Sequence, residues 1–246
     1  MRVGVLLARG MLAGAVAGLL CFVFLKIAGE PQIERAIAFE AQLIEAAREP
    51  ELVSRQVQAG IGLFTGVILY STALGGLFAL VFALAYRRIG ELRIKETSAL
   101  LAGLGAIALT ITPNLKYPAN PPSVGDPETI GARTALYFAM VFISIGAMVG
   151  AIMLRKRLLF KRDAYYASLV AAAAYLIAIA TFGFLLPSFN EVPDGFPAAV
   201  LWQFRLASFE SQLIMWAIIG ITFGALAEQV ANAELFRIRR ADGRLE

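Results

Sequence analysis

The sequence predicts an all-α polytopic membrane protein, a bundle of six transmembrane helices with both termini in the cytoplasm. Hydrophobic residues make up 59% of the 246 residues and charged residues only 16%. Soluble domains are roughly half apolar and about a quarter charged. The apolar residues form runs close to the ~20 residues that cross a bilayer as a helix, and Lys and Arg gather on alternate connections between these runs.

Six apolar runs are the expected spans of a single integral membrane domain, residues 1–246. They cover residues 5–28, 59–85, 98–113, 134–154, 167–186 and 209–231. The first run follows Arg2 and Arg9, as in a signal peptide, but no small-residue cleavage site precedes Gly29, so we expect an uncleaved helix. The third run is the shortest and is expected to stop at Pro113.

The basic residues orient these spans. Fifteen of the 22 Lys and Arg residues lie in the two termini and in the second and fourth connections, and six lie in the other three connections. The positive-inside rule places the basic connections in the cytoplasm. The first, third and fifth connections are therefore expected to be the outer loops.

Glycines four residues apart recur in four of the spans. Helix backbones approach closely at such glycines, which is how helices associate in lipid. The pattern predicts tight helix packing at Gly10, Gly14 and Gly18, at Gly62 and Gly66, at Gly146 and Gly150, and at Gly220 and Gly224.

Composition excludes several classes of function. The sequence has no histidine, the usual metal ligand and proton relay near neutral pH, and its single cysteine cannot form an internal disulfide. It has no phosphate-binding loop and no recognisable nucleophile–base set, so we expect no enzyme and no resident cofactor. The net charge of +4 forms no basic stripe, so we expect no nucleic-acid partner.

The outer loops carry most of the acidic side chains, and their net charge is −4. A negative mouth concentrates cations, although acidic loops can also serve only for solvation. In the first loop we expect an amphipathic outer helix from Pro31 to Glu49, because proline is favoured at a first helical position and Pro50 ends the helix. Its apolar stripe is Ile33, Ala36, Ile37, Ala41, Ile44 and Ala47.

Glu40 lies in the middle of that apolar stripe. A carboxylate there must pair with a cation or take a raised pKa, because burying it bare is costly. Two interpretations stay open: an ion pair with Arg55, Arg133 or Arg205, or a cation or proton site.

The second outer loop, residues 114–128, contains four prolines and follows Pro113. Proline fixes φ and removes N–H donors, so this Pro-rich loop is expected to be stiff, non-helical and rich in free carbonyls. Such backbone either forms a rigid cap or lines a transport site.

Several stretches, all but one of them in the outer connections, resemble the CbtA family, predicted cobalt-transporter subunits of the inner membrane. The matching stretches begin with Gly29-Glu-Pro-Gln-Ile33 and Gly62-Leu-Phe-Thr-Gly66 and continue with Leu115-Lys-Tyr-Pro-Ala-Asn-Pro-Pro-Ser-Val-Gly-Asp-Pro127, Arg133-Thr-Ala-Leu-Tyr137, Asn190-Glu-Val-Pro193 and Leu201-Trp-Gln-Phe-Arg-Leu-Ala-Ser208. The resemblance implies cobalt uptake linked to cobalamin synthesis. It also implies a small single-span partner, CbtB, which carries the histidines that this chain lacks.

We therefore expect a multi-pass inner-membrane subunit that moves a divalent metal cation inward, and the resemblance implies that this cation is Co²⁺. The alternative is a non-transporting membrane scaffold of a larger complex, and a homo-oligomer is a further option for the assembly. The expected outer cation path consists of Glu40, Asn120, Asp126, Glu128, Asn190 and Glu191. Arg55, Arg133 and Arg205 are expected to hold the loops by ion pairs.

Overall fold

A computed structural model describes residues 3–43 and 53–241, with side chains placed up to residues 42 and 233 in these two ranges. Every regular element in these residues is helical, which confirms the all-α class. Six helices are long and apolar enough to cross a membrane, as expected. They are Val3–Ala28, Arg55–Ala85, Ile94–Lys116, Pro127–Leu158, Ala164–Leu185 and Ala198–Ala233. The side on which the termini lie stays a prediction.

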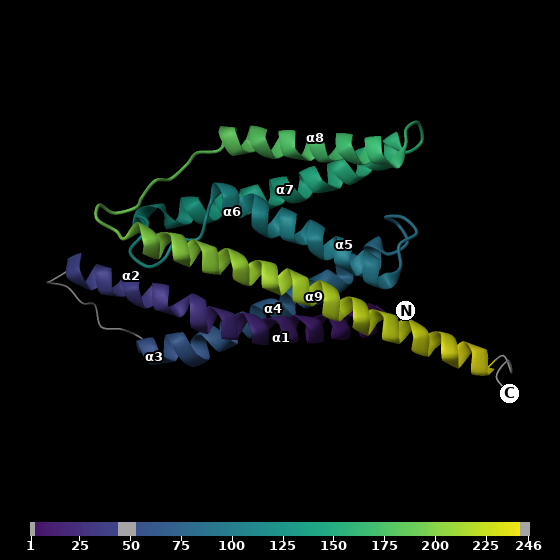
Figure 1. The fold of residues 1–246 in the computed structure, drawn as a ribbon, viewed down its shortest axis with the longest axis horizontal. Coiled ribbons are helices and arrows are strands. Elements are labelled where there is room, and N and C mark those ends of the chain that lie inside the picture. The colour runs from purple at the N-terminus through teal and green to yellow at the C-terminus, as the bar shows by residue number, and fades with distance from the viewer. Residues whose placement is uncertain (1–2, 44–52, 242–246) are drawn as a thin grey trace. The chain divides into compact units, whose positions relative to one another are not determined.

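The chain divides into two compact units. Figure 1 shows the helices in chain order by colour. The first unit comprises Met1–Pro31, Ala46–Gly103 and Glu210–Glu246, and the second comprises Gln32–Glu45 and Leu104–Phe209. The elements in chain order are α1 (Val3–Ala28), α2 (Glu30–Leu43), α3 (Arg55–Val57), η1 (Gln58–Gly62), α4 (Leu63–Ala85), α5 (Ile94–Ala106), η2 (Ile107–Ile111), α6 (Thr112–Lys116), η3 (Pro127–Thr129), α7 (Ile130–Leu158), α8 (Ala164–Leu185) and α9 (Ala198–Ala241).

Within the first unit, α1 packs along α4 with their backbones in close contact, as the glycine pattern predicted. A Cβ on Gly10 would overlap the Gly75 carbonyl oxygen, and a Cβ on Gly14 would overlap that of Ser71. The relation is mutual, since a Cβ on Gly75 would strike the Gly10 carbonyl. Only glycine permits this spacing, and the predicted packing at the first glycine set is confirmed.

Of the other glycine sets, one packs against a neighbouring helix as predicted and two do not. Gly220 and Gly224 of α9 pack against α5, where the Ser98 hydroxyl also donates to the Gly220 carbonyl at 2.7 Å. The packing predicted for Gly66, Gly146 and Gly150 is wrong for the described residues, because a Cβ at any of them would have no neighbour within 4 Å. Spacing alone does not say which glycine stripe meets another helix.

The third span does not stop at Pro113, which corrects the expected bounds 98–113. A π-helical turn, η2, precedes the proline, and the helix continues through α6 to Lys116. Pro113 lacks an N–H and its ring would clash with a carbonyl one α-turn earlier. A wider π turn relieves that conflict, so the span reaches 23 residues.

The sixth span also begins earlier than expected. α9 starts at Ala198 rather than residue 209, so Leu201–Ser208 is helical and the connection before it shortens to residues 186–197. The Pro197 carbonyl accepts hydrogen bonds from the Val200 and Leu201 amides at 3.0 and 3.2 Å, which begins the helix. Val200 and Ala207 are buried, so packing stabilises the first turns. The helix predicted from Pro31 to Glu49 is α2 as far as Leu43, and Ile44, Ala47 and Glu49 lie outside the described residues.

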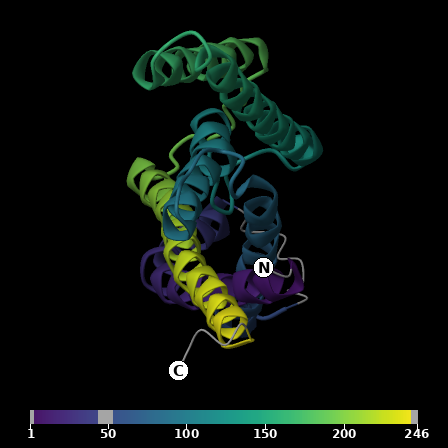
Figure 2. The same ribbon diagram turned by 90° about the vertical axis from the view of Figure 1, so that its right-hand side faces the viewer.

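In the second unit, α7 and α8 form a helical hairpin visible in both ribbon views (Figures 1 and 2). Its buried contact comprises Ala151, Ala171 and Tyr175. The Tyr175 hydroxyl lies 2.7 Å from the Thr112 hydroxyl and 2.8 Å from that of Ser144. These three hydroxyls satisfy one another, as buried polar groups in a membrane bundle must.

We expect Gly75→Ala to lower the thermal unfolding temperature of the purified protein, because one methyl group forces α1 away from α4. The cost should be about 1–3 kcal/mol, the usual range for overpacking. Gly146→Ala is the matched control, since it makes the same change in a helix where the new methyl meets no neighbour. Equal unfolding temperatures for the two variants would contradict the proposed close packing.

Candidate functional site

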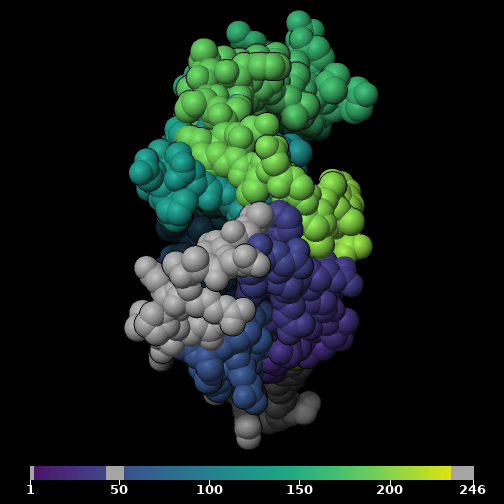
Figure 3. Space-filling view, turned by 90° about the vertical axis from the view of Figure 1, so that its left-hand side faces the viewer, coloured from purple at the N-terminus to yellow at the C-terminus, as the bar shows by residue number. Residues whose placement is uncertain are grey.

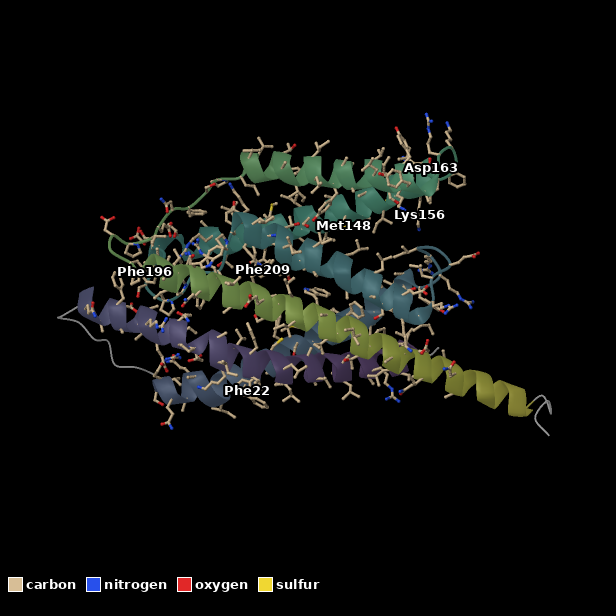
Figure 4. All side chains as sticks on the ribbon, in the orientation of Figure 1. Phe22, Met148, Lys156, Asp163, Phe196 and Phe209 are labelled. Atoms are coloured by element: carbon tan, nitrogen blue, oxygen red, sulfur yellow. The ribbon has the colours of Figure 1, made fainter. Side chains whose placement is uncertain are left out.

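Loop two, residues 117–126, is packed into the second unit rather than extended into solvent. Its Val124 is buried in a cluster with Ala36 of α2, Phe196 and Val200. The Phe39 and Phe196 rings meet edge to face at 5.1 Å, and the Ser123 hydroxyl donates to the Ala36 carbonyl at 3.3 Å. Figure 4 labels Phe196 at the end of its connection. Loop two therefore has a defined position within this unit.

The Glu191 carboxylate joins loop two to the connection between α8 and α9. Its Oε2 accepts hydrogen bonds from the Asp126 amide at 2.8 Å and the Thr129 hydroxyl at 2.9 Å. The Gly125 amide donates to the Glu191 carbonyl at 3.1 Å. The two segments lie side by side within the second unit, as these bonds require, and both can be seen in Figure 3. A half-buried carboxylate thus serves as their common acceptor.

Arg133, on the first turn of α7, completes this arrangement. Its Nε lies 3.4 Å from Glu191 Oε2 and donates to the Thr129 hydroxyl at 3.0 Å, and its Nη2 donates to the Asp126 carbonyl at 3.2 Å. The guanidinium lies against Gly125, where any Cβ would overlap it. Gly125 also has φ +114°, a conformation that favours glycine. We call Gly125, Asp126, Thr129, Arg133 and Glu191 the loop node.

The start of loop two has separate attachments. The Arg205 Nη2 donates to Asn120 Oδ1 at 2.7 Å, and its Nε donates to the Ala119 carbonyl at 3.3 Å. The Tyr117 hydroxyl donates to the Pro187 carbonyl at 2.7 Å. Burial raises the pKa of the Tyr117 phenol above its ordinary value, so the hydroxyl stays a donor at neutral pH.

The structure brings some of the predicted cation-path residues together. Asp126 and Glu191 belong to the loop node, and Glu128 adjoins it because its amide donates to Asp126 Oδ1 at 2.8 Å. Asn120 is held by Arg205. Asn190 is exposed and Glu40 half-buried, and within residues 3–43 and 53–241 no ion pair or hydrogen bond joins their side chains to the loop node.

The expected ion pairs of the three arginines are only partly observed. Arg133 pairs with Glu191, whereas Arg205 bonds an amide and a carbonyl oxygen. Arg55 pairs with Glu30, not Glu40. The pairing missed from the sequence joins residues just after α1 and just before η1, and only 5% of Glu30 is exposed. Among the described residues, Glu40 makes no ion pair.

In the same unit as Arg55, the Lys26 ammonium donates to the Ala59 carbonyl of η1 at 3.0 Å. A π turn departs from the usual i→i−4 bonding of a helix, and here a lysine bonds one of its carbonyls. Lys26 and the Arg55–Glu30 pair together place three charged groups near the end of α1. Arg55 and Glu30 neutralise each other, and the Lys26 ammonium keeps its positive charge. These three groups therefore do not favour a metal cation.

The loop node can attract a cation but is not a preformed metal centre. Asp126, Glu128 and Glu191 present three carboxylates against the single guanidinium of Arg133. Nevertheless, the described residues contain no group of three His, Cys, Asp or Glu side chains placed to hold a metal ion. Because the Asp126 amide and the Thr129 hydroxyl donate to Glu191 Oε2 and Arg133 Nε lies 3.4 Å from it, a cation bound there would compete with these groups or use Oε1. Such a site suits brief, weak binding.

We expect Glu191→Ala to loosen loop two, because the Asp126 amide and Arg133 lose a charged acceptor. Losing hydrogen bonds to a charged group should cost about 1.5–3 kcal/mol, measured by thermal unfolding, and should increase protease cleavage within residues 117–126. Glu128→Ala removes a neighbouring carboxylate that is exposed and should change neither. The role given to Glu191 fails if the two variants behave alike.

Comparison with known proteins identifies the family. A model of the CbtA family, described as "Probable cobalt transporter subunit (CbtA)", matches residues 3–228. No curated protein and no solved structure matches the chain. The match covers all six candidate spans up to residue 228 and confirms the family resemblance drawn from the loop motifs. The chain belongs to the CbtA family and is a probable cobalt transporter subunit of a membrane.

Proposed function

We propose that this chain is the permease subunit that carries Co²⁺ inward across the inner membrane, with both termini in the cytoplasm. The observation that supports this function best is the loop node, which together with the adjoining Glu128 gathers three carboxylates at one end of a membrane unit. The family match supplies the metal. Outward placement of the loop node follows from the basic residues on the alternate connections.

The charge distribution of the second unit supports this orientation. The carboxylates of Asp126 and Glu191 lie where α7 begins and α8 has ended. The opposite end of the α7–α8 hairpin carries Lys156, Arg157, Lys161 and Arg162, all exposed. In this orientation a cation meets negative charge outside, and the basic end lies in the cytoplasm.

The carboxylates would act by concentrating the hydrated cation rather than by holding it tightly. Asp126, Glu128 and Glu191 would form the entrance with Asn190, and Asn120 and Glu40 would lie along the path that follows. Conduction requires binding that is strong enough to attract the ion and weak enough to release it. A loop node with Arg133 at its centre meets both demands, because the guanidinium limits the net negative charge.

A second subunit would supply the nitrogen ligands. Cobalt(II) favours imidazole among protein ligands, and this chain has no histidine. We propose that a small single-span CbtB-like protein with histidines assembles with it in the bilayer. Copurification of such a protein, encoded beside this chain, would identify it directly.

The membrane potential is the proposed driving force. Moving one charge across 100 mV is worth about 2.3 kcal/mol, so a divalent ion gains roughly 4.6 kcal/mol, enough for more than about a thousandfold accumulation. We expect an ionophore that collapses the potential to abolish uptake of labelled cobalt by cells that make this chain and its partner. Uptake that continues without a potential would rule out this driving force.

The path residues can be tested separately from the driving force. We expect Glu40→Gln to lower labelled cobalt uptake several-fold while the protein stays abundant, since no described residue forms an ion pair with Glu40. Glu34→Gln is the matched control, because it removes one carboxylate from an exposed position of the same helix. A loss of protein in Glu40→Gln would instead indicate a structural ion pair.

Cobalt uptake by cells that lack this chain, or that make its path variants, distinguishes a permease from a scaffold. A permease predicts that uptake requires this chain and that path variants alter its rate. A scaffold predicts that uptake tolerates every path variant, provided that the complex still assembles. Uptake by the chain and partner reconstituted in vesicles, with an imposed potential, decides between them.

A further inference from the structure

The second unit contains a cavity of about 240 Å³ between α6, α7 and α8. Its lining includes Thr112, Leu115, Met140, Ile179, Gly183 and Phe184. Met140 and Thr112 are buried and form its floor, whereas Leu115 is 79% exposed and Phe184 90% exposed. The cavity is therefore apolar and opens on the face where the helices meet the surrounding medium.

One charged group lines this cavity, the ammonium of Lys116. It donates to the Ser188 hydroxyl at 2.6 Å and lies 5.9 Å from the centre of the Tyr117 ring. Among the described residues no carboxylate forms an ion pair with it. The Thr112 hydroxyl is already bonded to Tyr175. Lys116 is thus the cavity's only cationic group, and it has no anionic partner within the described chain.

The position of Lys116 places this cation at the boundary of the bilayer. Lys116 is the last residue of the third candidate span, and Leu185 is the last of the fifth. The lining residues of α8, Ile179 to Phe184, lie within roughly 9 Å of that end at 1.5 Å per residue. The apolar part of the cavity therefore lies in the hydrocarbon layer, with the ammonium at the level of lipid headgroups.

We propose that this cavity binds one anionic phospholipid, with its phosphate on Lys116 and part of an acyl chain between α6, α7 and α8. An apolar slot that opens to hydrocarbon fits an acyl chain, and an unneutralised ammonium at headgroup depth attracts an anionic headgroup. Cobalt would be repelled by the same ammonium, so the cavity lies off any cation path. The lipid contacts the residue that precedes loop two and stabilises the Lys116–Ser188 connection.

Native mass spectrometry of the purified protein tests the site with phosphatidylglycerol and phosphatidylcholine as probes. We expect one phosphatidylglycerol to bind about fivefold more tightly than phosphatidylcholine, the effect of one basic residue near an anionic lipid. Lys116→Gln should remove that preference. Gly183→Leu should weaken binding of both lipids, because its side chain extends into the cavity from a position with no neighbour within 4 Å of a Cβ.

Two controls make the result decisive. Lys156→Gln removes a cation at the far end of α7 (Figure 4) and should leave the preference unchanged. Inorganic phosphate should not displace the lipid, which separates a phospholipid from a free anion. The proposal is overturned if Lys116→Gln keeps the preference, if folded Gly183→Leu keeps the lipid, or if the cavity is closed by a second protein instead. Thermal unfolding of each variant establishes that it is folded.

Discussion

Hydrocarbon cannot bond a peptide N–H or C=O, so each span must satisfy its backbone internally. This constraint explains why two departures from regular α-helix are π turns rather than breaks. At η2 the chain passes Pro113 without leaving the helix. At η1 the Lys26 ammonium bonds the Ala59 carbonyl. Both turns lie near the ends of spans, where the chain changes from a membrane helix to a loop.

Side chains at the helix ends hold the loops in position. Arg133 extends from the first turn of α7, and Arg205 extends from a part of α9 that the sequence suggested was a loop. Each arginine bonds loop two, one at residues 125–126 and the other at residues 119–120. A proline-rich segment with few donors of its own therefore takes its position from side chains of neighbouring helices. This places the carboxylates close together without making them a tight metal site.

The sequence predicted which residue types would interact better than which partners they would choose. It marked Arg55, Arg133 and Arg205 as residues that hold loops, and all three do bond loop or helix-end groups. It could not tell that Arg55 would pair with Glu30 or that Glu191 would accept bonds from loop two. Which residue each side chain bonds depends on where two helix ends meet. The sequence pattern of a single segment does not predict that position.

Periodicity, composition and charge by themselves determined the six apolar helices and the alternating basic connections, because each depends on neighbours in the chain. The family resemblance came separately, from short sequence stretches such as Leu115–Pro127. The tertiary structure decided which glycines serve packing. Gly10 and Gly75 meet, whereas Gly146 has the same spacing and no neighbour. It also decided that the third span continues beyond Pro113 and that Arg133, Asp126 and Glu191 converge. These outcomes depend on contacts between residues far apart in the chain, whose free energies no single segment contains.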